Sequence, residues 1–149
     1  MKIINRSFIT LLLSLAFFTA NAQKIKIKKD KVLVDKAEWA KFYKDKDNKR
    51  IRVFTNPDGD ILLHVKAEGY NDPKQITSDN PKGYVGYWSI CDPETGTVYF
   101  EMQGLQKKVM EVLYQNEVIN PDGTLNKENL DKLAAKMGKD FSRIRDELN

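Results

Sequence analysis

Residues 50–64 read Arg-Ile-Arg-Val-Phe-Thr-Asn-Pro-Asp-Gly-Asp-Ile-Leu-Leu-His and contain the clearest local structure in the chain. Residues 51–55 alternate in the manner of a strand, and residues 61–67 form a second β-rich run. Between them lies Asn-Pro-Asp-Gly, in which Pro presets φ for the second turn position and Gly tolerates a left-handed fourth position. This stretch therefore predicts a β-hairpin.

A two-residue period continues on both sides of this hairpin, from residue 24 to residue 103, and is typical of half-buried strands. Isoleucines alternate with lysines in residues 24–28, and residues 31–35 form a more apolar run. Residues 37–44 fit either a helical face or an irregular strand. The strands before this segment and the turn-like residues 45–48 favour the strand.

A second hairpin is predicted over residues 84–103. Both faces of residues 84–91 are apolar, which indicates a central strand. The returning strand alternates in a way that points Glu101 to solvent. Residues 66–83 are rich in Gly, Asn, Asp, Pro and Ser, and predict a long loop with a short strand at residues 74–77.

After the second hairpin the period becomes that of a helix. Apolar residues at i, i+4, i+7 and i+8 from Leu105 predict an amphipathic helix. A second helix begins after Thr124 or Asn126, either of which suits an N-cap, and ends at Gly138. Asp140 is predicted to cap a last short helix.

Strands followed by helices in one small chain predict an α+β fold. We expect an antiparallel β-meander of about six or seven strands over residues 24–103, followed by two or three C-terminal α-helices over residues 105–148. No linker divides the chain, so residues 23–149 are expected to form one domain.

The first 22 residues have the features of a secretory signal peptide. A positively charged start precedes an apolar stretch at residues 8–18, which is too short for a spanning helix of roughly twenty residues. Small residues at Ala20 and Ala22 predict cleavage before Gln23. We expect a periplasmic or secreted protein without an integral membrane segment after cleavage, a destination that argues against nucleic acid as partner. An uncleaved anchor is the alternative.

Charge is distributed unevenly along the mature chain. Residues 23–53 hold twelve Lys and Arg against five Asp and Glu, whereas residues 54–149 hold eleven against sixteen. The simplest interpretation is a solvated strand face balanced by the acidic remainder. The alternative is a basic face for an anionic partner, such as a phospholipid surface or an acidic glycan. Four lysines would form that face: Lys24, Lys26, Lys28 and Lys29.

Few residues are candidates for catalysis or metal binding. His64 is the only histidine and Cys91 the only cysteine, so neither a zinc site nor a nucleophile–base pair is predicted. The acidic segment 122–128 does not fit an EF-hand, because Val118 falls at the first ligand position. No metal, cofactor or catalytic residue is predicted. A small hydrolase using an unidentified carboxylate pair is an alternative.

Aromatic side chains gather around the predicted long loop and second hairpin. Tyr and Trp anchor partners in binding surfaces, although strands also favour aromatic residues as core. The predicted binding residues are Tyr70, Tyr84, Tyr87, Trp88 and Tyr99, with Tyr87 and Tyr99 as the leading pair. Our leading hypothesis is a non-catalytic exported domain that binds an envelope protein or a glycan. Polyanion or membrane-surface binding through the basic face is the second hypothesis.

Export predicts a defined mature N-terminus. Mass spectrometry of the exported protein should show a chain that begins at Gln23. Replacing Ala20 and Ala22 by Leu should abolish this cleavage, because the peptidase accepts only small side chains at these positions. A chain that keeps residues 1–22 while exported would contradict the prediction.

Overall fold

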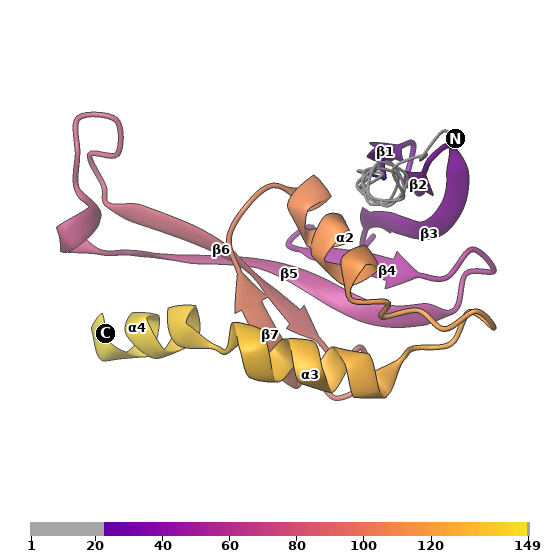
Figure 1. Ribbon diagram of the computed structural model, residues 1–149. Coiled ribbons are helices and arrows are strands. Elements are labelled where there is room, and N and C mark those ends of the chain that lie inside the picture. Colours follow the sequence, from indigo (N-terminus) through magenta and orange to yellow (C-terminus); the bar gives the residue numbers. More distant parts are fainter. Residues whose placement is uncertain (1–22, 149) are drawn as a thin grey trace, which may run out of the picture.

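The computed structural model describes residues 23–148, which form a seven-stranded antiparallel sheet followed by three helices (Figure 1). Strands lie side by side in chain order, so the sheet is a meander and the predicted α+β fold is confirmed. The predicted signal peptide lies outside the described residues.

The strands are β1 (Ile25–Lys28), β2 (Lys31–Val34), β3 (Ala37–Lys44), β4 (Ile51–Thr55), β5 (Ile61–Asn71), β6 (Tyr84–Cys91) and β7 (Val98–Met102). The helices are α2 (Gln106–Gln115), α3 (Lys127–Met137) and α4 (Asp140–Leu148), with a short 3-10 helix, η1 (Pro73–Gln75).

One face of the sheet forms the main core with α2 and α3. Residues from four strands meet there and are fully buried, namely Phe54, Leu63, Ile90 and Phe100. Apolar residues of α2 and α3 join the same cluster, among them Val109, Leu113 and Leu130. Burial of such a side chain stabilises the fold by about 1.5–3 kcal/mol. None of the helices within residues 23–148 has the length and apolar composition that a membrane span requires.

The opposite face of the sheet is covered at its β5–β7 end by α4. Tyr87 points to this face, is 3% exposed and stacks on Phe141 of α4, with ring centroids 5.3 Å apart. Gly138, which ends α3 with φ of 74°, accepts a hydrogen bond from the backbone N–H of Glu101 on the edge strand β7. The chain thus passes around the β7 edge between α3 and α4.

Two predictions are wrong here: that Glu101 faces solvent, and that Asp140 caps the last helix. Glu101 is 2% exposed, because α4 covers the face to which it points. Its Oε2 accepts a hydrogen bond from the backbone N–H of Ser142 in the first turn of α4, at 3.0 Å. A carboxylate from β7 therefore caps α4 in place of Asp140, which instead pairs with Arg143. Its Oε1 has no partner among the described residues.

The prediction for residues 66–83 is also wrong in part. β5 continues to Asn71 and pairs with β6 as far as Tyr84, so the two strands project as a long arm (Figure 1). η1 occupies the place of the predicted short strand. Gly69 lies opposite Gly86, and the Tyr84 ring covers the space that a Gly69 side chain would need. This pairing lengthens the strands where local composition indicated a loop. The strand expected at residues 37–44 is confirmed as β3.

Asn56 ties the β4–β5 turn to the α2–α3 loop. It is 4% exposed, and its Oδ1 accepts the backbone N–H groups of Gly59 and Asp60 at 2.8 and 2.9 Å. Its Nδ2 donates to the Asp60 carboxylate and, at 3.1 Å, to the Gly123 carbonyl. One buried amide thus joins two loops 67 residues apart in sequence.

Replacing Asn56 by Ala should lower the free energy of unfolding by about 2–3 kcal/mol, because several buried hydrogen bonds are lost together. Urea unfolding measures the change. Asn48→Ala is the matched control, since Asn48 lies in an exposed turn and its side chain accepts one bond, from the Arg50 N–H. Equal losses in the two variants would contradict the assigned role of Asn56.

Candidate functional site: an aromatic cleft between β3 and α2

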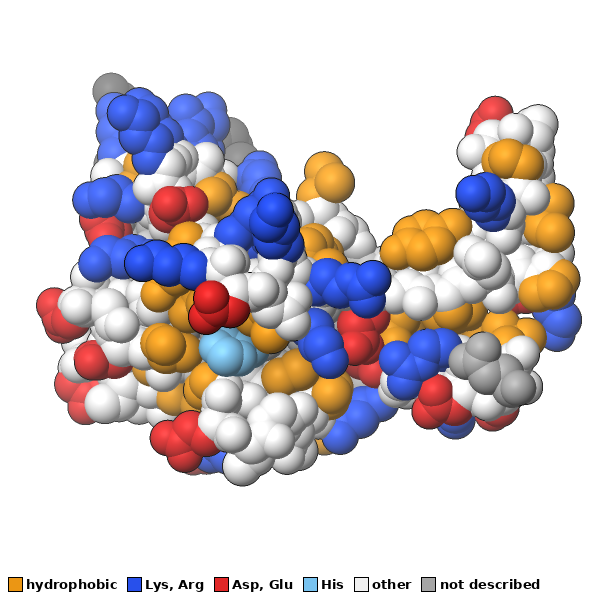
Figure 2. All heavy atoms as spheres, turned by 180° about the vertical axis from the view of Figure 1, so that it is seen from behind, with side chains coloured by type: hydrophobic (Ala, Val, Ile, Leu, Met, Phe, Trp, Pro, Cys, Tyr) orange, Lys and Arg blue, Asp and Glu red, His pale blue; other side chains and the backbone are white. Residues whose placement is uncertain are grey.

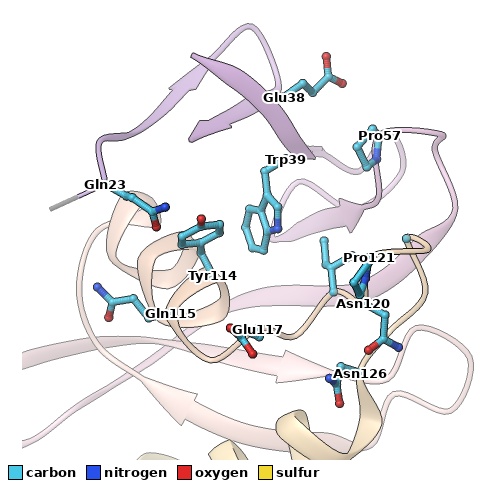
Figure 3. Close-up of a pocket in the computed structure, with 12 residues that line it drawn as sticks. Gln23, Glu38, Trp39, Pro57, Tyr114, Gln115, Glu117, Asn120, Pro121 and Asn126 are labelled. Atoms are coloured by element: carbon cyan, nitrogen blue, oxygen red, sulfur yellow. The ribbon is translucent and has the colours of Figure 1, made fainter. Parts of the chain in front are cut away.

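A cleft of about 730 Å³ opens between β3, the β4–β5 turn, the end of α2 and the α2–α3 loop (Figure 3). Trp39 enters it from β3, and Tyr114 from α2 points toward Trp39. Pro57 of the β4–β5 turn and Pro121 of the α2–α3 loop line its other side. The Asn56 bond to Gly123 holds these last two walls together.

A β-bulge in β3 sets the direction in which the Trp39 side chain points. The β2–β3 register shifts between Val32 and Leu33, which pair with Ala40 and Glu38, so Trp39 is an extra residue on its strand. Such a bulge redirects a side chain from the regular alternation. The Trp39 ring packs against Phe54 with centroids 5.5 Å apart and meets Tyr114 edge-on at 5.1 Å. Both rings are half-buried, so each is held in place while part of it faces the cleft.

Amide side chains surround the two rings. Gln23 and Gln115 line the cleft beside Tyr114, and neither amide has a hydrogen-bond partner within the part of the chain that the structure describes. Asn120 instead donates to Thr124 Oγ1 at 3.0 Å, and Asn126 accepts from the Asn129 N–H as the N-cap of α3. The cleft thus combines fixed loop amides with two that are available to a ligand.

The two carboxylates that line the cleft, Glu38 and Glu117, are held in different ways. Glu38 is tied to Lys31 at 2.5 Å, and its carboxylate points away from Trp39 in Figure 3. Glu117 is held through its backbone, where its carbonyl accepts from Asn129 Nδ2 at 3.2 Å. Residues 23–148 contain no group of three or more His, Cys, Asp or Glu suited to a metal ion.

Two of the predicted binding aromatics are accessible on the arm formed by β5 and β6. Tyr84 is 58% exposed and lies across Gly69 and Gly86. Trp88 is half-buried, and its Nε1–H donates to the Gly104 carbonyl at 2.8 Å. Both residues border a hollow of about 250 Å³. Their role in binding stays a prediction.

The other three predicted aromatics make contacts within the fold, Tyr87 as a buried residue and Tyr70 and Tyr99 as half-buried ones. Tyr87, one of the leading pair, is buried beneath Phe141 and also contacts Tyr70, with centroids 6.2 Å apart, so it does not offer the exposed anchor that we expected. Tyr99 donates to Asp92 at 3.1 Å, and the Lys127 ammonium lies 5.0 Å from its ring centre. Burial and the Asp92 carboxylate raise the pKa of Tyr99 to about 12. Tyr87 nevertheless borders the same hollow as Tyr84 and Trp88.

The sequence contained only weak signals for the cleft itself. Trp39 stood in a segment that fitted both helix and strand, and Tyr114 flanked the apolar stripe of a predicted helix. A tryptophan in a lysine-rich strand was the one hint. No local pattern indicated that this strand and this helix face each other.

A polar network connects α4 to the arm. Glu68 Oε2 accepts from the Tyr87 hydroxyl at 3.0 Å and from Ser89 Oγ at 3.1 Å, and its Oε1 lies 3.2 Å from the Lys66 ammonium. Arg145 of α4 lies 3.4 Å from the same carboxylate. Burial alone would raise the pKa of Glu68, but the hydrogen bonds from Lys66, Tyr87 and Ser89 outweigh it and lower that pKa.

Comparison of the chain with family models, with curated proteins and with solved structures finds no match.

Ionised Glu68 should stabilise the fold in a pH-dependent way. Because its pKa is lower in the folded state, its contribution is present above the ordinary value of 4.5 and is lost as pH falls below it. Glu68→Gln should therefore lose less stability than the wild type between about pH 6 and about pH 3. Urea unfolding across this range tests the expectation, with Glu94→Gln in an exposed turn as control. Parallel curves for wild type and Glu68→Gln would contradict it.

Proposed function

We propose that this protein is a non-catalytic, exported binding domain whose cleft at Trp39 and Tyr114 accepts a glycan. The observation that supports this proposal most directly is the half-exposed aromatic pair beside the amides of Gln23 and Gln115, which have no hydrogen-bond partner among residues 23–148. Export rests on the predicted signal peptide at residues 1–22.

The chemistry of a sugar suits this combination. A pyranose ring has an apolar C–H face that packs on an aromatic ring, and a rim of hydroxyl groups that both donate and accept hydrogen bonds. Each Gln amide can accept hydrogen bonds through its carbonyl oxygen and donate two through its NH₂ group. Glu117, just after the end of α2, adds a further acceptor to the lining.

The shape also favours a small ligand over a protein partner. Protein interfaces bury about 800 Å² on each partner and are close to flat, whereas ligand sites are concave hollows of about 300–1,000 Å³. The cleft falls in this second class at about 730 Å³. A short oligosaccharide is the ligand that matches its size and its mixed lining.

The chain has two tryptophans, Trp39 and Trp88, which allows a specific optical test. In a Trp88→Phe background, Trp39 is the only tryptophan reporter. Titration with hexasaccharides of glucose and of N-acetylglucosamine should give a saturable change in its fluorescence. Gln115→Ala should weaken binding up to about tenfold, since lost hydrogen bonds contribute about 0.5–1.5 kcal/mol each.

Tyr84→Ala is the control for this titration, because Tyr84 is exposed on the arm and does not line the cleft. It should leave sugar affinity unchanged. Loss of binding in Tyr84→Ala with full binding in Gln115→Ala would move the site to the arm. No fluorescence response and no thermal stabilisation with either sugar series would contradict the glycan proposal.

A further inference from the structure

We infer that the outer face of the β1–β2 hairpin is a separate binding site for a linear polyanion, an anionic polysaccharide. This site does not depend on what the aromatic cleft binds. It lies on the sheet face opposite the main core, at the end that α4 leaves uncovered.

Strand alternation builds the site. Ile25 points into the core and is 3% exposed, so Lys24, Lys26 and Lys28 point to the other face. Side chains two residues apart on a strand are about 7 Å apart, which places three ammonium groups in a row. Leu33 lies opposite Lys26 in the β1–β2 register and contributes an apolar side chain to the groove. The resulting groove has a volume of about 370 Å³ and is lined by Lys24, Lys26, Lys28, Leu33, Asp35 and Lys36.

The charges in this groove are not neutralised. Across residues 23–148, no carboxylate lies within 4.0 Å of the ammonium groups of its four lysines. Its one acid, Asp35, accepts the backbone N–H of Lys24 at 3.0 Å. The helices differ, because Lys107, Lys127 and Lys132 each pair with an acid on the same helix.

The turns beside the groove place lysines in the left-handed backbone conformation, which is unfavourable for residues other than Gly and Asn. Lys29 and Asp30 have φ of 48° and 66°, and Asp35 and Lys36 have φ of 48° and 76°. Two consecutive left-handed residues suit the tight turns of hairpins, where Gly and Asn are preferred. Lysine carries a steric cost there, and strained residues concentrate at functional sites. Lys36 borders the groove itself.

The surface view shows the consequence of this arrangement. Lys and Arg side chains gather over the β1–β3 end of the molecule, at the upper left of Figure 2. Acidic side chains are more frequent elsewhere on the same face (Figure 2). An approaching polyanion is therefore attracted to this end.

The shape of the site selects among polyanions. A groove accommodates a linear chain, whereas a bilayer presents a broad surface and is usually bound with apolar side chains inserted. The exposed large apolar residues of the described chain are Ile61, Ile76, Tyr84, Leu105 and Leu148, and β1 to β3 contain none of them. Nucleic acid is disfavoured by the predicted export. A polysaccharide bearing carboxylate or sulfate groups fits best.

Charge-matched variants test this inference. Lys24→Gln/Lys26→Gln/Lys28→Gln removes three groove charges, and Lys107→Gln/Lys127→Gln/Lys132→Gln removes three paired charges elsewhere. Calorimetric titration with dextran sulfate and polygalacturonate should show affinity about tenfold or more weaker in the groove variant, close to wild-type affinity in the control, and a decrease with salt. Neutral dextran should not bind. Equal weakening in both variants, or salt-independent binding, would overturn the inference.

Two further measurements keep the test independent of folding. Lys36→Asn should raise Tm, because Asn tolerates the left-handed conformation, and should still weaken polyanion binding. Unchanged affinity in this more stable variant would count against the site. Co-sedimentation with phosphatidylglycerol vesicles, in the absence of binding to either polysaccharide, would assign the lysines to a membrane surface instead and refute the proposal.

Discussion

Partial coverage of the sheet by its helices determines the other features of this fold. Seven strands spaced by about 4.8 Å give a sheet about 29 Å wide, and the eleven residues of β5 extend about 37 Å. α2 and α3 have ten and eleven residues, so each is only about 15–17 Å long. Two such helices bury the centre of one face and leave the margins of the sheet open.

The uncovered parts of the sheet differ in the side chains that they expose. Where α2 ends beside β3, the uncovered Trp39 and Tyr114 form the wall of a cleft. Where β5 and β6 extend beyond their neighbours, the arm carries the exposed Tyr84. The second face carries, at the β1 end, lysines that have no carboxylate partner in the described part of the chain, and it is covered by α4 at the β7 end. Gln23 and Lys24, which are adjacent in sequence, line the cleft and the groove respectively.

The contact between α4 and the sheet is mainly polar, in contrast to the apolar core on the other face. α4 has no buried residue, and its position depends on Phe141 stacking on Tyr87, on Arg145 near Glu68, and on the Glu101 carboxylate at its first turn. Hydrogen bonds to charged groups contribute about 1.5–3 kcal/mol when partly buried. A helix with a weak apolar stripe can therefore dock, provided that the strands supply its partners.

The sequence by itself determined most of the strands, the meander and the helices, because hairpin turns and side-chain periods are local properties. Residues 50–64 contain their own turn, and Asn126 and Gly138 delimit α3 as their capping preferences predicted. The alternation of Lys24 to Lys28 with isoleucines also predicted a lysine face. Only the tertiary structure decided which faces are covered. It buried Glu101 and Tyr87 under α4, lengthened β5 through the Gly69–Gly86 pairing, and brought Trp39 to Tyr114 across 75 residues. These contacts join segments distant in the chain, and the periodicity of one strand carries no information about which helix will lie above it.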